Sequence, residues 1–223
     1  MNPRLACGTL LGLLALTSLA LAQQEKWGGE SDNFKDVLLF GYEMPKGGIA
    51  GLPTDVRAAA ISYRQRQDRF RSRLTPPSDK EWVVQITFAK HVAFERVIWS
   101  LFTASDIARV AADFVDFVPL PYEWEGMSEP PTAETEGAEA FLQAHPQTPI
   151  APYLHLFVAH RHLCAASFLA TCQDCRERDA HLGKFQAAIG LAKQARHALI
   201  RVVARELAER PTCYDEQEDG GGF

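Results

Sequence analysis

The sequence predicts an all-α fold in which antiparallel helical hairpins, or a helical bundle, follow an irregular N-terminal arm. Two observations indicate this class. From Thr54 onward, apolar residues recur at alternating spacings of four and three, as they do on one face of a helix. Proline-rich stretches, notably Pro76-Pro77 and residues 119–131, separate these periodic segments at places where helices have to end.

Residues 1–22 have the order of a secretory signal peptide. A basic opening that contains Arg4 precedes an apolar run from Leu10 to Leu21, and the run ends in the triplet Ala20-Leu21-Ala22. The run is shorter than the roughly 18 to 20 apolar residues that a membrane span requires. We therefore expect cleavage after Ala22 and an exported protein, periplasmic or secreted, without a membrane span after cleavage.

The mature chain is acidic and long enough for one sizeable core. Cleavage removes one basic residue and no acidic one, so the formal net charge falls from −5 to −6. This charge gives no electrostatic basis for binding nucleic acid. We expect an irregular arm at 23–54, a single helical domain at 55–212 and an acidic, disordered tail at 213–223.

The first half of the domain is expected to form three helices. The first carries six arginines between Arg57 and Arg73 outside its apolar face. Ser78 and Glu81 form a capping box that opens the second, and Ser105 caps the third. The expected helices are 55–74, 82–102 and 106–118.

The second half is expected to form three more helices. Thr148 followed by Pro149 is an N-cap with proline at the first helical position, where the missing donor costs nothing. Pro211 ends the last helix. The expected helices are 134–144, 149–170 and 179–210, with a loop at 171–178.

The segment Phe141-Leu142-Gln143-Ala144-His145-Pro146-Gln147-Thr148-Pro149-Ile150-Ala151-Pro152-Tyr153 resembles the turn between units of tetratricopeptide-like proteins of the bacterial envelope. The resemblance extends over residues 138–160. Residues 111–119 echo residues 138–146 at a period of 27, against 34 in that family, and no third copy is present. The resemblance implies a helical scaffold that binds other proteins.

Four cysteines remain in the mature chain: Cys164, Cys172, Cys175 and Cys213. In an exported protein we expect disulfides, for which three connectivities exist. If the last helix is straight, its roughly 30 residues place Cys213 about 45 Å from the 171–178 loop. A bridge from Cys213 then requires a bend at Gly183 or Gly190, but we expect these glycines to let a neighbouring helix pack closely instead.

A zinc site is the alternative use of these cysteines. His160 and Cys164 are four residues apart and share one side of the long helix. With Cys172 and Cys175 arriving from the loop, they would complete a Cys3His site. Because export favours disulfides, we expect no metal and no cofactor.

Arg161 lies in the middle of the apolar stripe of the same helix, whereas His155 and His162 fall on its polar side. A guanidinium is too costly to bury unpaired. One interpretation is an internal ion pair that joins helices. The other is an anion clamp in a cleft, with His160 and Tyr153 as further ligand- or partner-binding residues.

Two other charged groups have several interpretations. The arginines between Arg57 and Arg73 bind an anionic partner, pair with acidic residues, or form a solvated helix face. His91 and Glu95, four residues apart, are a metal half-site or ordinary helix surface. The acidic residues considered for the arginines are Glu123, Glu125, Glu129, Glu134 and Glu136.

The sequence contains none of the common catalytic signatures. It has no Gly-x-Ser-x-Gly elbow, no His-Glu-x-x-His pair, no phosphate-binding loop and no Gly-x-Gly-x-x-Gly turn. It therefore predicts an exported, non-enzymatic helical scaffold that binds a protein partner. The alternative is a small-molecule or metal-binding module centred on residues 149–181.

Overall fold

The computed structural model describes residues 34–45, 49–121, 123–170 and 176–214. They belong to one compact unit, and residues 1–33, with the expected signal peptide, lie outside the described residues. Within the described ranges all regular secondary structure is helical, which confirms the predicted all-α class. The helices are α2 (Phe34–Leu39), α3 (Thr54–Gln67), α4 (Trp82–Leu101), α5 (Ile107–Phe117), α6 (Glu129–Ala144), α7 (Ala151–Phe168), α8 (Arg176–Ala192) and α9 (Ala198–Glu209).

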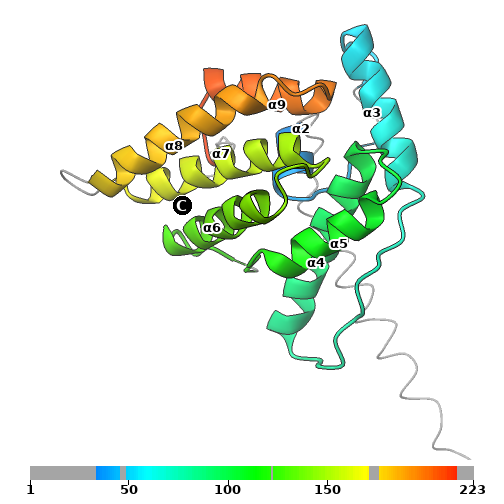
Figure 1. Cartoon of the computed structure of the whole chain (residues 1–223), viewed down its shortest axis with the longest axis horizontal. Helices are drawn as coiled ribbons and strands as arrows, with labels where there is room; N and C mark the ends of the chain where they lie inside the picture. The colour runs from blue at the N-terminus through cyan, green and yellow to red at the C-terminus, as the bar shows by residue number, and fades with distance from the viewer. Residues whose placement is uncertain (1–33, 46–48, 122, 171–175, 215–223) are drawn as a thin grey trace, which may run out of the picture. The chain divides into compact units, whose positions relative to one another are not determined.

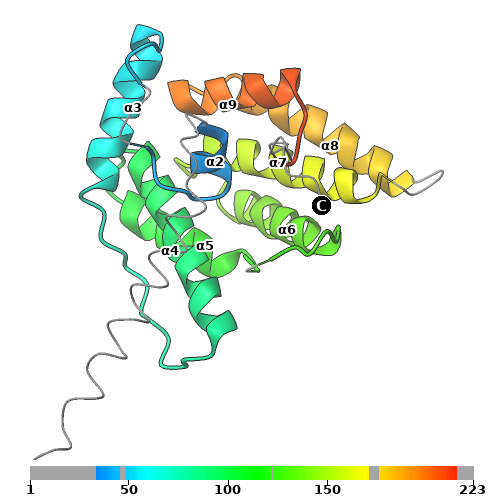
Figure 2. The same ribbon diagram turned by 180° about the vertical axis from the view of Figure 1, so that it is seen from behind.

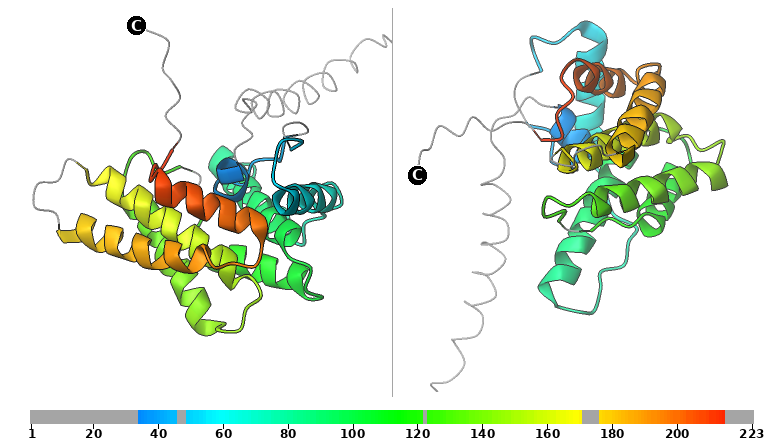
Figure 3. Two further views of the ribbon diagram at one scale, coloured as in Figure 1. Left: turned by 90° about the horizontal axis from the view of Figure 1, so that it is seen from above. Right: turned by 90° about the vertical axis from the view of Figure 1, so that its left-hand side faces the viewer.

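Helix α7 is the centre of the fold. Its side chains are buried without interruption from Leu156 to Ala166, because α6, α8 and α9 all pack against it. Figures 1 and 2 show α6, α7 and α8 side by side, with α4 and α5 forming a second hairpin and α3 standing beside it. Figure 3, seen from above, shows α9 lying across this group. A helix that is buried on all sides has no distinct polar face, so the polar side predicted for this helix is wrong.

The irregular arm expected at 23–54 contains a helix, α2, so the prediction is wrong for residues 34–39. Residues 34–39 are helical, and Phe34, Val37, Leu38 and Leu39 are buried. Positions 34, 37 and 38 have the spacing of one helix face, but the glycine-rich surroundings concealed so short an element. The arm is therefore part of the core in this region.

Several helix boundaries differ from those expected. Helix α3 ends at Gln67, seven residues before the predicted end. Helix α4 begins after Glu81 with no side-chain cap, so the predicted capping box is wrong; the Asp79 carboxylate instead accepts from the Glu81 N–H at 2.8 Å. Helix α6 begins at Glu129, because two prolines in its first turn occupy positions where no donor is needed.

The single helix expected at 179–210 is two helices. The chain turns between Ala192 and Ala198, not at Gly183 or Gly190. The Arg201 guanidinium stabilises the turn by donating to the carbonyls of Ala195 and Arg196, at 3.1 and 2.6 Å. This turn reverses the chain, so that the segment after α9 returns to α7.

The helical glycines differ in what surrounds them. At Gly183 and Gly190 a Cβ would meet no heavy atom within 4 Å, so the close helix packing expected there is wrong. At Gly137 a Cβ would lie 2.7 Å from Pro119 Cδ and 3.3 Å from Val118 Cα. Among the helical glycines of the described ranges, only Gly137 allows two segments to approach closely, here α6 and the segment directly after α5.

None of the helices in the described ranges combines the length and the apolar character needed to cross a bilayer.

The glycines provide a matched pair of substitutions. We expect Gly137→Ala to lower the free energy of unfolding by about 1 to 3 kcal/mol, because the new methyl group overlaps Pro119. Gly183→Ala adds a methyl group to α8 where no other atom is close. It should raise the free energy of unfolding by up to about 1 kcal/mol, because alanine has the higher helix propensity. Urea unfolding of both variants measures this, and effects of equal sign would contradict the packing described.

Candidate functional site

Arg161 lies at the centre of a buried cluster of charges. Its side chain is fully buried on α7, and its Nε donates to Glu134 Oε2 on α6 at 2.6 Å. The same carboxylate accepts from Trp124 Nε1 at 2.9 Å and pairs with Lys90 on α4 at 3.0 Å. Burial alone raises the pKa of Glu134, but the Arg161 and Lys90 charges outweigh it and hold that pKa below its usual value. The predicted internal ion pair that joins helices is confirmed.

The remaining donors of Arg161 determine the tautomer of His160. Arg161 Nη1 donates to the Leu39 carbonyl at 2.8 Å and to His160 Nδ1 at 2.7 Å. Since a guanidinium only donates, His160 Nδ1 is an acceptor and the ring proton is on Nε2. Nε2 then donates to the Cys213 carbonyl at 2.9 Å. Burial and the adjacent guanidinium lower the pKa of His160 well below its usual value, so the ring is neutral.

Aromatic rings surround the guanidinium. Its Cζ lies 4.1 Å from the ring centroid of Phe157, 4.9 Å from Trp124, 5.5 Å from Phe94 and 6.0 Å from Phe40. Arg161 Nη2 has no hydrogen-bond partner among the described residues. The π faces therefore stabilise the part of the cation that hydrogen bonds do not reach.

The geometry favours the ion pair over the anion clamp proposed for Arg161, His160 and Tyr153. All three side chains are fully buried. The Tyr153 hydroxyl donates to the Leu38 carbonyl at 2.9 Å, and burial raises the pKa of this phenol. The three residues join α7 to α2 and to the segment after α9, and they do not line an open cleft.

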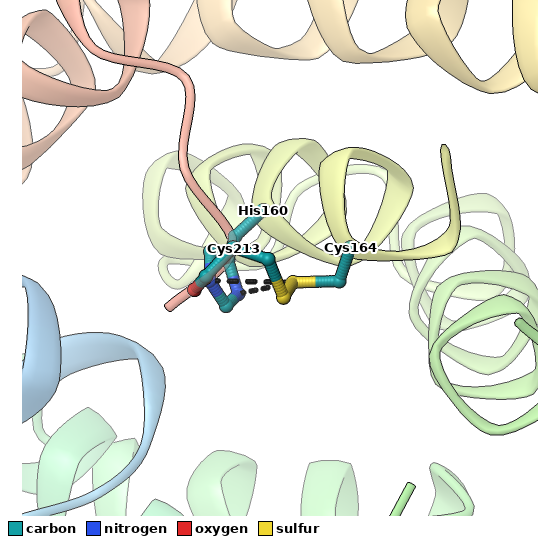
Figure 4. A group of neighbouring side chains, drawn as sticks. All are labelled: His160, Cys164 and Cys213. Carbon is teal, nitrogen blue, oxygen red and sulfur yellow. Dashed lines mark hydrogen bonds between the residues drawn. A yellow bond between two sulfur atoms is a disulfide. The ribbon is translucent and has the colours of Figure 1, made fainter. Parts of the chain in front are cut away.

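A disulfide links Cys164 on α7 to Cys213 in the segment after α9 (Figure 4). The turn between α8 and α9 makes this bridge possible, whereas a straight helix would have kept the two cysteines apart. His160, Cys164 and Cys213 bring three potential metal ligands together. The sulfurs are bonded to each other and both His160 nitrogens are occupied, so the zinc set with Cys172 and Cys175 lacks two of its ligands.

Cys172 and Cys175 lie outside the described residues, as do residues 215–223 of the expected tail. Cys213 and Tyr214, which were assigned to that tail, belong to the folded unit.

The disulfide places Tyr214 over the charge cluster. Its ring stacks on Phe40, with centroids 5.6 Å apart, and also contacts Trp124 and Phe168, at 6.1 and 6.3 Å. The Tyr214 side chain is half exposed, whereas the Trp124 side chain that it contacts is buried. The C-terminal segment therefore closes the cluster from the solvent side.

The other charged groups considered from the sequence hold elements together. The Glu95 carboxylate is buried and accepts from the Arg73 N–H at 2.9 Å and from the Ser72 hydroxyl, so it is neither helix surface nor free to join His91. Arg66 stacks on the Trp99 ring at 4.4 Å and donates to the Trp99 carbonyl. Glu134, a candidate partner of the arginine run, pairs with Arg161 instead.

The amino-terminal half of α4 presents apolar side chains to solvent. We call residues 82–92 the α4 projection, because Figures 1 and 2 show this half extending beyond the other helices. None of its residues is fully buried, whereas most residues from Phe94 to Leu101 are. Trp82 is 61% exposed and Val83 43%. The periodicity of the sequence does not show where along this helix the packing stops.

An open groove of about 600 Å³ lies between the carboxyl end of α4, the amino end of α7 and the α8–α9 turn. Phe102, His155 and His197 are among its lining residues. Burial, and secondarily Arg201, lower the pKa of His197 to about 4, so this imidazole is neutral. No pattern in the sequence had indicated a role for His197.

Comparison of the chain with protein-family models, with curated proteins and with solved structures found no match. The resemblance to tetratricopeptide-like proteins therefore stays a prediction.

Replacing Arg161 tests the role of the buried ion pair. In Arg161→Met, Glu134 loses its closest cation, and we expect a loss of about 3 to 5 kcal/mol in the free energy of unfolding. The double variant Glu134→Leu/Arg161→Met removes both charges and should regain part of that loss. Urea unfolding measures all three proteins, and a double variant no more stable than Arg161→Met would contradict the pairing.

Replacing Cys213 tests the closure of the C-terminal segment. The two cysteines are 49 residues apart in sequence, and loop-closure entropy assigns a bridge of this span about 4 kcal/mol. We expect Cys213→Ser to lose an amount of this order in urea unfolding. Reductant should destabilise the parent protein by a similar amount and change Cys213→Ser much less; an equal response of both proteins would show that the bridge does not form.

Proposed function

We propose that this protein is exported and binds a protein partner by inserting the α4 projection into an apolar groove of that partner. The order of residues 1–22 supports export, and a disulfide is compatible with an oxidising compartment. The observation that carries the proposal is the exposure of the projection. Exposed apolar surface of this kind is typical of interaction sites.

The distribution of side chains around the projection supports a groove as the complementary surface. At 100° per residue, Trp82 and Ile86 lie on one side, Val83 on a second, and Val84, Phe88 and Val92 on a third. Lys90 of the projection pairs with Glu134 of α6, so that part of the helix is already covered. A partner that contacts one of the remaining sides would leave the others in water, whereas a groove that receives the helix covers them.

A second copy of the chain is a poorer complement. The projection contains 11 residues, so a side-by-side pair would share a contact about 16 Å long and 10 Å wide. Stable interfaces bury about 800 Å² on each partner, which is far more. A receiving groove increases the area without lengthening the helix.

The segment before α4 carries a small positive charge. Arg69, Arg71, Arg73 and Lys80 are exposed in the 68–81 connection together with three acids, Asp68, Asp79 and Glu81, so its net charge is 4 − 3 = +1. A groove with an acidic rim would complement this charge and speed association. An anionic membrane offers similar chemistry, so vesicles belong in the test.

Two matched substitutions test the projection. Val83→Asp places a charge on the projection, and Ile61→Asp places one at a similarly exposed β-branched residue on α3, with 43% and 38% of the parent side chains exposed. A photo-crosslinking amino acid at position 82, in cells that export the chain, should give one discrete adduct with a chain that begins at Gln23. With the partner so identified and purified, we expect Val83→Asp to weaken binding at least tenfold and Ile61→Asp less than twofold.

Three results would overturn this proposal. One is a homodimer in light scattering that Val83→Asp dissociates, since a second copy then covers the projection. Another is cosedimentation with phosphatidylglycerol vesicles that Val83→Asp abolishes. The third is equal partner binding by both variants. The free energy of unfolding of each variant serves as the folding control, because a substitution at an exposed position should change it by about 0.5 kcal/mol or less.

A further inference from the structure

His162 on α7 and His181 on α8 face each other in the interior, apart from the Arg161 cluster. Their Nδ1 atoms lie 2.9 Å apart, and the residues are only 1% and 7% exposed. Sequence analysis placed His162 on the polar side of the helix, and α8 covers that side. Two buried imidazoles from different helices therefore direct the same ring nitrogen toward each other.

Glu139 on α6 contacts the other nitrogen of the His162 ring. Its Oε1 lies 3.4 Å from His162 Nε2, on the opposite side of the ring from His181. When Nε2 donates to this carboxylate, the lone pair of His162 is on Nδ1 and points toward His181. A carboxylate that orients a histidine in this way is characteristic of metal ligands.

We propose that His162 Nδ1 and His181 Nδ1 form a binding site for a divalent transition-metal ion, with Cu²⁺ the preferred ion and Glu139 as the orienting residue. Two nitrogens bonded to one ion at about 2.0 to 2.1 Å and at a right angle are about 2.9 Å apart, which is the distance observed. Right angles are characteristic of tetragonal Cu²⁺ sites, and imidazole binds Cu²⁺ most strongly among the first-row divalent ions. A tetrahedral ion would require the nitrogens about 0.4 Å farther apart.

Binding requires a change of tautomer and a rotation of both rings, because ring centroids 5.1 Å apart mean that the two Nδ1 atoms point almost directly at each other. Without metal, His181 Nδ1–H donates to His162 Nδ1, which has no proton. When the ion binds, the proton of His181 moves to its own Nε2, and both Nδ1 lone pairs bond to the metal. No net proton is released.

The charges near the pair favour a cation. Glu139 on α6 interacts with His162, and Glu136, Glu139 and Glu177 all act on His181, against one positive group, Lys184. Burial lowers the pKa of His162 to about 4 and also lowers that of His181, so both rings are neutral at pH 7. Neutral imidazole is the form that binds metal.

Copper titration of the tag-free, oxidised mature chain tests the proposal. We expect one Cu²⁺ to bind, with hyperfine coupling to two nitrogens in its electron paramagnetic resonance spectrum. His162→Gln and His181→Gln should each weaken binding at least tenfold in calorimetry and lose one nitrogen coupling. His155→Gln, on the same helix but outside the pair, should bind as the parent does.

Two further variants change the charge without removing a ligand. Glu139→Gln should weaken Cu²⁺ binding about 10- to 100-fold, as loss of an orienting partner does. Lys184 is 56% exposed, and its Nζ lies 3.8 Å from Glu139. Lys184→Gln should strengthen binding roughly two- to fivefold, because it removes a nearby positive charge while leaving the fold intact.

The result that would overturn the proposal is equal Cu²⁺ affinity of the parent and of His162→Gln/His181→Gln, which would reduce the pair to a hydrogen bond between α7 and α8. An unchanged affinity in Lys184→Gln would count equally against it. Neither result depends on the α4 projection, so this site and the proposed partner binding are tested separately.

Discussion

The rest of the structure depends on the requirement that the Arg161 charge be paired inside the core. Burying a guanidinium without a partner is prohibitive, and three segments besides α7 provide what it needs. Glu134 of α6 supplies the countercharge, Leu39 of α2 a carbonyl, and His160 a ring nitrogen that is itself positioned by Cys213. The cation thus determines where the ends of the described chain must lie, which hydrophobic burial alone does not specify.

The fold divides into a closely packed part and an open part. Around α7, the described helices, rings and disulfide pack closely, and both members of the ion pair are fully buried. Along α4 the packing stops at Phe94, so one continuous helix is core at its carboxyl end and apolar surface at its amino end. Charged residues are usually exposed and apolar residues usually buried, but here both occur in the opposite place. The buried charge is tolerated because it is paired. The exposed apolar surface is, in our proposal, covered by a partner.

Periodicity predicted the helical class and five of the helices to within a few residues at most of their ends, and burial cost alone predicted that Arg161 is paired. Its partner was not predictable, because Glu134 follows two prolines in a helix whose start was placed too late. The break after Ala192 was not predicted either, because Arg201, which follows the turn, stabilises it, and no local glycine or proline marks it. The pairing of His162 with His181 depends on how α8 packs on α7, and no local pattern encodes that.

The hydrogen bonds of Arg161 also bear on when the chain can fold. One acceptor is at Leu39, near the beginning of the described unit, and His160 takes its orientation from Cys213, near the end. A polypeptide that emerges from its N-terminus cannot complete these contacts until Cys213 has appeared. The core around Arg161 is therefore unfinished for as long as α9 and the segment after it are missing.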